Sequence, residues 1–300
     1  MEKDRGVCLG LIGLGLVGTA LAERFLEAGY CVCGCDIDPG RCRESQSRGV
    51  SIADSPARIA ESSARVVFSL PDSCVVREVM LGTDGILSSG LPTLIMDTTT
   101  GEPDAVVEIA GRAASVGSAY VDACIIGSSR QVAEGEVIVV AGGTAEDLER
   151  CRDLLETFAR ETFHMGSPGK GSEAKLIVNL VLGLNRLVLS EGLVLAEHLN
   201  LDMGKVLDLL RAGASYSRVM DVKGEKMLLR DFRPQARLAQ HLKDVRLILQ
   251  LGRKAGLSLH LSDLHRRLLQ AGADAGVGDL DNSAIIEVLR RSLYRPKPAE

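Results

Sequence analysis

The sequence predicts an α/β protein with a doubly wound parallel sheet in its first half and an all-helical second half. Two observations support this fold class. Short apolar runs alternate with helical patterns up to about residue 166, and alternating strands and helices build parallel sheets. Strand signals then stop, and apolar residues recur at helical spacing. We therefore expect two domains, residues 1–166 and residues 167–300.

Six segments of the first half are predicted to be strands, because they are short apolar runs rich in β-branched residues. They are VCLGLIG, CVCGCD, ARVVFSLP, TLIMDT, AYVDACI and EVIVVAGG. The connecting helices are predicted in LVGTALAERFLEAG, in residues 54–63 and in VVEIAGRAASVG.

In the second half, a long helix is predicted from Glu173 to about Leu199, where apolar residues recur almost all round. Its most membrane-like part, LIVNLVLGLNRLVLS, is interrupted by Asn179, Asn185 and Arg186 and falls short of the roughly 20 apolar residues of a membrane span. We interpret it as a buried helix. ARLAQHLKDVRLILQLGRKAG is predicted to be a further, amphipathic helix, and no regular structure is expected for the tail YRPKPAE.

The composition limits the possible partners. The 300 residues carry a net charge of -5, so no basic field would gather nucleic acid or an anionic membrane. Aromatic residues make up 3% and Trp is absent, which leaves few platforms for base stacking. The N-terminus lacks a signal-peptide pattern, and we expect a cytoplasmic protein.

Eight cysteines occur without a CxxC pair, and three of them alternate at positions 31, 33 and 35. Alternation places those three on one strand face, so a thiolate metal cluster is geometrically conceivable. No further Cys or His spacing supports it. We expect packed, reduced core cysteines, no bound metal and a reducing compartment.

The stretch GLGLVG fits the dinucleotide-binding pattern G-x-G-x-x-G, with a predicted strand before it and a predicted helix after it. Its glycines permit a tight turn and close backbone approach, so a pyrophosphate can bind at the helix N-terminus. The alternative is a glycine-rich turn without function. The expected cofactor contacts are Gly13, Leu14, Gly15, Leu16, Val17 and Gly18.

The second predicted strand ends at Asp36, where the fingerprint places an acidic residue. A carboxylate there accepts hydrogen bonds from the adenosine ribose and repels a 2′-phosphate. Asp36, with the adjacent Ile37, therefore favours NAD over NADP. Arg41 and Arg43 lie a little further on and keep NADP open.

The segment GKGSEAKLIVN lies at the start of the predicted long helix, and Lys175 and Asn179 project from one of its faces. A lysine in an apolar segment can extend to solvent, which is the alternative without function. Near a substrate carbonyl, its ammonium acts as a general acid in reduction and its amine as a general base in oxidation. Asn179 would orient Lys175 or the substrate.

The chain resembles the β-hydroxyacid dehydrogenase family, the group that contains 3-hydroxyisobutyrate dehydrogenase and tartronate semialdehyde reductase, nearly end to end. The family's GLGxMG appears as GLGLVG, its LPN as LPDS, its D-x-S-T as DTTT and its GxGxxxKxxNN as GKGSEAKLIVN. Its KDL appears as KDV and its G-x-G-D-x-D-x-S-A as GVGDLDNSA. The motifs fall in the same order, and together they are specific.

The resemblance implies the roles of several residues. It matches Lys175 to the catalytic lysine and Asn179 to the second asparagine, while Val178 replaces the first. Further cofactor contacts implied by the matches are Leu70, Pro71, Thr100 and Lys243. It also implies a Rossmann domain, a long interdomain helix and a helical C-terminal domain, with the active site in the cleft, and a homodimer or homotetramer.

The substrate loop departs from the family's DAPVSGG, in which the serine hydroxyl and glycine amides hold the substrate carboxylate. Here the loop reads DACIIGS, so Cys124 replaces the proline and Ile126 replaces the serine. The lost charge-assisted hydrogen bond is worth about 1.5–3 kcal/mol. Ser128, Ser129 or Arg130 could replace it, although Arg130 facing solvent is an equal alternative.

A second departure is Ala236 in RPQARL, at the position of the phenylalanine in the family's P-G-F. Both changes make the pocket less polar, and the second makes it roomier. We expect a substrate other than the two standard ones. The expected substrate contacts are Ile126, Gly127, Ser128, Arg130 and Ala236.

These observations predict an NAD-dependent oxidoreductase that interconverts a β-hydroxy acid and its semialdehyde, with Lys175 as general acid and base. One alternative is an NADPH-dependent imine reductase on the same architecture. Such relatives usually lack the lysine. The other alternative is a regulatory module that binds a nucleotide without turnover, and the presence of both Lys175 and Asp36 argues against it.

Overall fold

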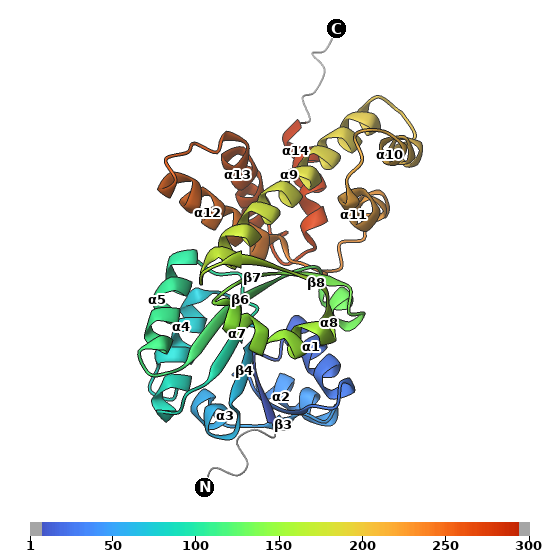
Figure 1. Cartoon of the computed structure of the whole chain (residues 1–300). Coiled ribbons are helices and arrows are strands. Elements are labelled where there is room, and N and C mark those ends of the chain that lie inside the picture. Colours follow the sequence, from blue (N-terminus) through green and yellow to red (C-terminus); the bar gives the residue numbers. More distant parts are fainter. Residues whose placement is uncertain (1–7, 294–300) are drawn as a thin grey trace. The chain divides into compact units, whose positions relative to one another are not determined.

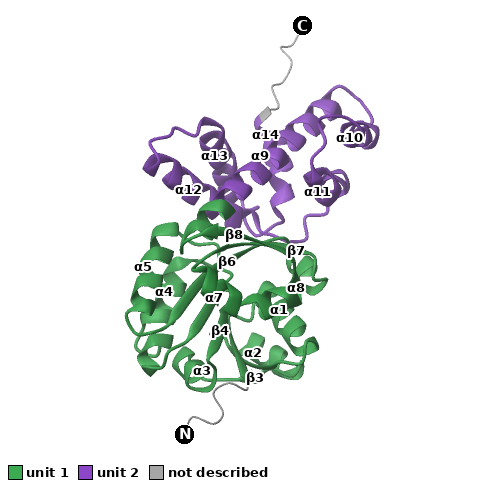
Figure 2. Cartoon of the chain, in the orientation of Figure 1, with its two compact units in different colours: residues 1–175 green, residues 176–300 purple. Residues whose placement is uncertain are grey.

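The structure, a computed structural model, describes residues 8–293, so the tail YRPKPAE lies outside the described residues. Contacts divide the chain into two compact units, Met1–Lys175 and Leu176–Glu300 (Figure 2). The division falls inside the long helix α9 (Lys170–His198), whereas the sequence prediction placed the domain boundary ahead of this helix, at residue 166.

Within the described residues, the first unit is built on an eight-stranded sheet with the order β3-β2-β1-β4-β5-β6-β7-β8 (Figure 1). The chain winds outward from β1 in one direction and from β4 in the other, and only the β6–β7 pair is antiparallel. The predicted doubly wound fold is confirmed, with a mainly parallel sheet. The strands are β1 (Cys8–Ile12), β2 (Cys31–Cys35), β3 (Ser51–Ile52), β4 (Arg65–Phe68), β5 (Leu94–Asp97), β6 (Ala119–Ile126), β7 (Val137–Gly142) and β8 (Ala159–Gly166).

Two features of the sheet differ from the sequence prediction. The first is the antiparallel pairing of β6 and β7, where a parallel sheet was predicted. The connection between them, residues 127–136, is short, and a parallel crossover needs about a dozen residues or more. Strand β3, which has only two residues, was not predicted, and neither was strand β8. Strand β8 lies at the sheet edge, and most of its residues, ARETFHMG, are exposed, so it lacks the apolar run of a buried strand.

Helices cover both faces of the sheet, because alternate strand residues point to opposite sides. On β1, Leu9 and Leu11 pack into one core and Ile12 into the other. Residues of α1 (Leu16–Glu27), α6 (Ser129–Ala133) and α8 (Arg152–Phe158) complete the first core. Residues of α3 (Pro56–Ser62), α4 (Ser73–Leu81), η1 (Ile86–Ser89) and α5 (Pro103–Ala114) complete the second. The remaining helices are α2 (Pro39–Ser47) and α7 (Ala145–Arg150).

The second unit is helical and has its own apolar core. The predicted stripe on α12 is confirmed, since Leu238, Leu242, Val245 and Leu249 are all buried. After α9 come α10 (Met203–Ala212), α11 (Arg218–Leu229), α12 (Leu238–Lys254), α13 (His260–Asp274), η2 (Asn282–Ala284) and α14 (Ile285–Leu293).

Helix α9 is, by length and composition, apolar enough to cross a membrane, so the expectation that this segment falls short is wrong. Such a test is also met by the core helices of globular proteins. Asn179, Arg186 and Ser190 of this helix are buried within the protein, and a buried polar face is costly in hydrocarbon unless it is paired. We interpret α9 as a core helix.

The cysteines differ from the sequence prediction at one pair. Cys8 and Cys31 are register partners on the neighbouring strands β1 and β2, with their Cα atoms 4.6 Å apart, and they form a disulfide. The prediction of reduced cysteines is wrong for this pair, and with it one support for a reducing compartment is lost. The other cysteines are free, namely Cys33, Cys35, Cys42, Cys74, Cys124 and Cys151.

Candidate cofactor and active site

The three glycines of GLGLVG are required for three different reasons. Gly13 follows β1 with φ +94°, a left-handed conformation, and a Cβ there would lie 2.2 Å from the Ser69 carbonyl oxygen. A Cβ on Gly18 would lie 1.9 Å from the Gly13 carbonyl oxygen, so α1 packs directly on the turn. Gly15 faces almost open space, where a pyrophosphate could approach the helix N-terminus. The turn lies between β1 and β4, where the winding of the sheet reverses.

Asp36 follows β2 and stands beside this turn. Its carboxylate accepts hydrogen bonds from the backbone N–H of Leu14, at 2.7 Å, and of Asp38, at 2.9 Å. Arg41 pairs with Asp36 at 3.5 Å and is half-exposed. Ile37 is fully exposed, and such an apolar side chain suits an adenine ring. Asp36 therefore keeps acceptor capacity for a ribose, but a cation lies next to it.

The loops after β4 and β5 are tied together at the same edge of the sheet. Thr99 Oγ1 accepts a hydrogen bond from the backbone N–H of Leu70, at 3.2 Å. Asp97 accepts one from the backbone N–H of Thr99 and another from the hydroxyl of Tyr120. Burial raises the pKa of Asp97 to about 6, although these hydrogen bonds act to lower it. The hydrogen bonds of the buried Asp97 carboxylate thus fix the loop after β5, which carries Thr100.

Lys175 is buried, with 8% of its surface exposed, in the first turns of α9. This burial argues against the solvent-facing alternative for Lys175. Near it in the first unit lies Cys124, whose thiol donates to the Thr99 carbonyl and lies 3.7 Å from Ser172 Oγ. Burial raises the pKa of Cys124 to about 12, so it stays a neutral thiol.

In the second unit, Asn179 and the KDV segment come together. The side-chain amide of Asn179 donates to Asp244 Oδ2, at 2.9 Å. Lys243 lies 3.3 Å from the other oxygen of the same carboxylate. Asp244 is buried, and it fixes the orientation of the Asn179 amide. The sequence prediction named Asn179 and Lys243 but missed the carboxylate between them.

Ala236 lies exposed in a segment that Asp281 organises. Asp281 Oδ2 accepts hydrogen bonds from the backbone N–H of Gln235, at 3.0 Å, and of Ala236, at 3.3 Å. Lys223 pairs with the same carboxylate at 2.9 Å. The motif GVGDLDNSA therefore has a structural role in the second unit, because its Asp281 fixes the backbone of the segment before α12.

The substrate loop offers fewer free donors than its sequence suggests. Ser128 caps α6 in a capping box with Gln131, and its hydroxyl donates to Gln131 Oε1, at 3.2 Å. Arg130 has 80% of its side chain exposed and pairs with Glu134 at 2.8 Å, which favours the solvent-facing alternative. Ile126 is half-buried at the end of β6 and Gly127 is exposed. Of the polar features predicted here, the Gly127 backbone and Ser129, which is half-buried at the start of α6, remain as candidates.

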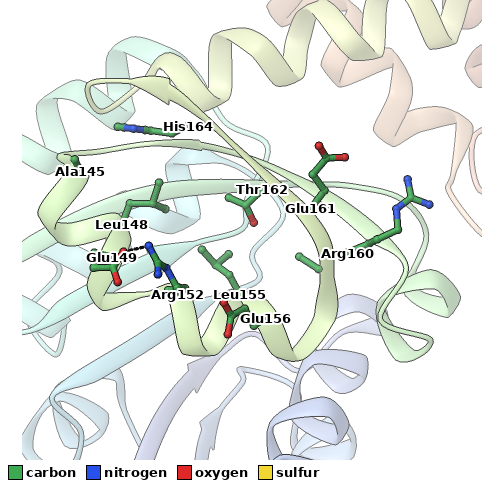
Figure 3. Close-up of a pocket in the computed structure, with 11 residues that line it drawn as sticks. Ala145, Leu148, Glu149, Arg152, Leu155, Glu156, Arg160, Glu161, Thr162 and His164 are labelled. Atoms are coloured by element: carbon green, nitrogen blue, oxygen red, sulfur yellow. Dashed lines mark ion pairs between the residues drawn. The ribbon is translucent and has the colours of Figure 1, made fainter.

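A pocket of about 510 Å³ lies in the first unit, and Figure 3 shows the residues that line it. It is lined by residues of α7, α8 and the edge strand β8. Two of its charged side chains pair with each other, Arg152 with Glu149. None of the predicted site residues lines it, so we do not assign the reaction to this pocket. Across residues 8–293, no group of three or more potential metal ligands occurs.

Family models match both halves of the chain. Residues 8–166 match the NAD binding domain of 6-phosphogluconate dehydrogenase. Residues 169–289 match the model described as NAD-binding of NADP-dependent 3-hydroxyisobutyrate dehydrogenase.

Individual proteins are similar over almost their whole length. Probable 3-hydroxyisobutyrate dehydrogenase-like 2, mitochondrial, of Arabidopsis thaliana is 31% identical and covers 94% of this chain and 93% of its own. Glyoxylate/succinic semialdehyde reductase 1 of the same plant is 28% identical, with 95% and 99% covered. The solved structure of Mycobacterium tuberculosis 3-hydroxyisobutyrate dehydrogenase with L-serine has a TM-score of 0.85, 27% identity and coverage of 95% and 99%.

The matched NAD-binding models, together with relatives that are named dehydrogenases and reductases, show that the protein is a nicotinamide-dependent oxidoreductase that acts on CH–OH groups. The chain belongs to the β-hydroxyacid dehydrogenase family, as the resemblance in its motifs predicted.

Proposed function

We propose that this enzyme uses NAD to interconvert a β-hydroxy acid and its semialdehyde, with Lys175 as general acid and base. The buried position of Lys175 at the start of α9 is the observation that carries this proposal. A bound nicotinamide would supply the hydride chemistry. Lys175 takes the hydroxyl proton in oxidation and returns it in reduction, while Asn179, one turn further along α9, is held by Asp244.

The test of this role is Lys175→Ala. We expect kcat to fall at least about a hundredfold, the range expected for the loss of a general acid, with NADH binding retained in a fluorescence titration. Lys170→Ala is the matched control, because Lys170 is an exposed lysine in the first turn of the same helix, about one turn before Lys175, and pairs with Glu173 at 2.7 Å. Near-normal turnover of Lys175→Ala would remove the lysine from the mechanism.

The proposals for cofactor and substrate share one experiment, an oxidation screen with NAD and NADP in parallel. Asp36 supports a higher kcat/KM with NAD, and an equal or higher value with NADP would contradict this, with Arg41 as the responsible cation. The screen covers β-hydroxy acids with carboxylate, sulfonate and bulky substituents.

A non-standard substrate is supported by Ile126 at the hydroxyl position and by Ser128, whose hydroxyl is engaged in the capping box. Comparable turnover of 3-hydroxyisobutyrate or of tartronate semialdehyde would count against it. Formation of amines with NADPH, without oxidation of any hydroxy acid, would favour the imine reductase alternative.

A homodimer or homotetramer also stays a proposal. Val181, Val188 and Leu195 recur every seven residues on α9 and are exposed, a spacing typical of helices that pack against another helix. We propose a second copy of this chain as the partner of that stripe. Analytical ultracentrifugation of the purified protein would measure the assembly, and a monomer at micromolar concentration would contradict it.

A further inference from the structure

We propose that Asp122 is a positioning residue, which fixes the first turn of α9 and thereby the place of Lys175. The inference rests on the proposed role of Lys175 as general acid and base. Asp122 lies within the apolar run of β6 and is buried, with 1% of its surface exposed.

Helix α9 begins without a capping side chain of its own. The carbonyl of Gly169 accepts a hydrogen bond from the N–H of Glu173, at 2.9 Å, so Gly169 is the N-cap residue. A capping box normally satisfies two donors at such a start, the N–H of the N-cap residue and the N–H three residues later. Gly169 has no side chain with which to do so.

Asp122 supplies both acceptors from the sheet. Its Oδ1 accepts a hydrogen bond from the N–H of Gly169, at 2.9 Å, and its Oδ2 accepts one from the N–H of Ser172, at 2.7 Å. One carboxylate of β6 therefore accepts both of the hydrogen bonds that two local side chains accept in an ordinary capping box. The negative charge also lies at the positive end of the helix dipole.

Two glycines bring the helix close enough for these bonds. A Cβ on Gly142 of β7 would lie 2.5 Å from Asp122 Oδ1, and a Cβ on Gly171 would lie 2.7 Å from the Gly142 N. The backbone of the first helical turn therefore rests directly on the backbone of β7. Neither glycine has a side chain that could take up a displacement of the turn.

Lys175 follows Ser172 by three residues, about one turn of the same helix. A helix transmits a shift of its first turn to the next one, and a misplacement of about 1 Å can cost about a hundredfold in rate. Asp122 therefore acts on turnover through Lys175, without a contact to the reacting atoms.

A double-mutant cycle between Asp122→Asn and Lys175→Ala tests this inference. The Asn side chain is isosteric, but it presents an N–H₂ group to one of the two backbone donors, so one bond is lost. With Lys175 present, we expect kcat to fall about tenfold to a hundredfold, with the Kd for NADH changed less than about twofold. With Lys175→Ala, the same change should lower kcat less than about twofold.

Asp202→Asn is the matched control. Asp202 also accepts two backbone N–H groups at a helix start, those of Gly204 and Lys205, but α10 carries no residue of the proposed site. Its kcat should stay within about twofold of wild type. Gly171→Ala is a second variant that displaces the same turn, and its effect should also vanish without Lys175.

Equal losses from Asp122→Asn in both backgrounds would overturn the inference, because they would show a general structural role. An unchanged kcat with Lys175 present would overturn it as well. Near-normal kcat in Lys175→Ala alone would instead overturn the proposed function, so the two failures are distinguishable. Thermal unfolding of each variant confirms that folded protein is compared.

Discussion

Asp122 in the first unit and Asp281 in the second are both buried carboxylates that accept hydrogen bonds from backbone N–H groups. Among residues 8–293, an ion pair is found at Asp281 and not at Asp122. Asp122 accepts from Gly169 and Ser172. Asp281 accepts from Gln235 and Ser283 and also binds the ammonium of Lys223, at 2.9 Å.

The two carboxyl groups differ in the direction of their pKa. Burial raises the pKa of Asp122 to about 6, although its two amide donors and the side chain of Ser172 act to lower it. Burial also acts to raise the pKa of Asp281, but Lys223 and the hydrogen bonds outweigh it and the pKa is lowered. Neutral hydrogen-bond donors therefore do not offset burial at Asp122, whereas an ammonium together with several donors does so at Asp281. The first arrangement allows protonation under mild acid, and the second does not.

The largest change in unfolding free energy should come from removing the ammonium of Lys223 that pairs with Asp281. Lys223→Met leaves Asp281 ionised and buried without its counter-ion, which costs about 3–5 kcal/mol of unfolding free energy. Urea unfolding at pH 7 measures it, with Lys205→Met, at an exposed lysine of α10, as the control. A loss no larger than that of the control would show that the amide donors suffice at Asp281.

Substitution of Asp97, the register partner of Asp122 on β5, is expected to increase the stability of the folded protein, by less than the loss of Lys223 decreases it. Its pKa is raised to about 6 from 3.8, so the folded state binds the proton more tightly than the unfolded state. The ionised form then costs up to about 3 kcal/mol above pH 6, and this cost disappears as the pH falls toward 4.

Asp97→Asn should therefore raise the melting temperature at pH 8, because it removes the buried charge. The advantage over wild type should shrink as the pH is lowered through 6. Thermal unfolding at several pH values between 5 and 8 measures this difference. An advantage that does not vary with pH would mean that Asp97 does not titrate in this range.

The fold and the first elements of the site were accessible from the sequence, because their signals are local. Gly13, Gly15 and Gly18 lie within one turn between a strand and a helix, and Lys175 lies in a short motif. The positioning role that we propose for Asp122 was not predicted, because the partners of its carboxylate lie some fifty residues further along the chain. Only the acid itself, in an otherwise apolar strand, was a signal.

Other differences have the same origin. Ser128 was predicted to contact substrate, but the sequence does not show that its hydroxyl is engaged by Gln131. Asp244 became visible only once α9 and α12 were placed together. The disulfide of Cys8 and Cys31 depends on the register of two strands, which apolar runs do not specify.

The missing local cap of α9 has a consequence for the order of folding. Asp122 and Gly169 are 47 residues apart in sequence, so closing this contact requires the ordering of a long loop. Gly169 has no side chain that could cap the helix. The carboxylate oxygens of Asp122, which cap it instead, are in position only after β6 has joined the sheet. The end of α9 that carries Lys175 is therefore expected to form late, after the sheet of the first unit has folded.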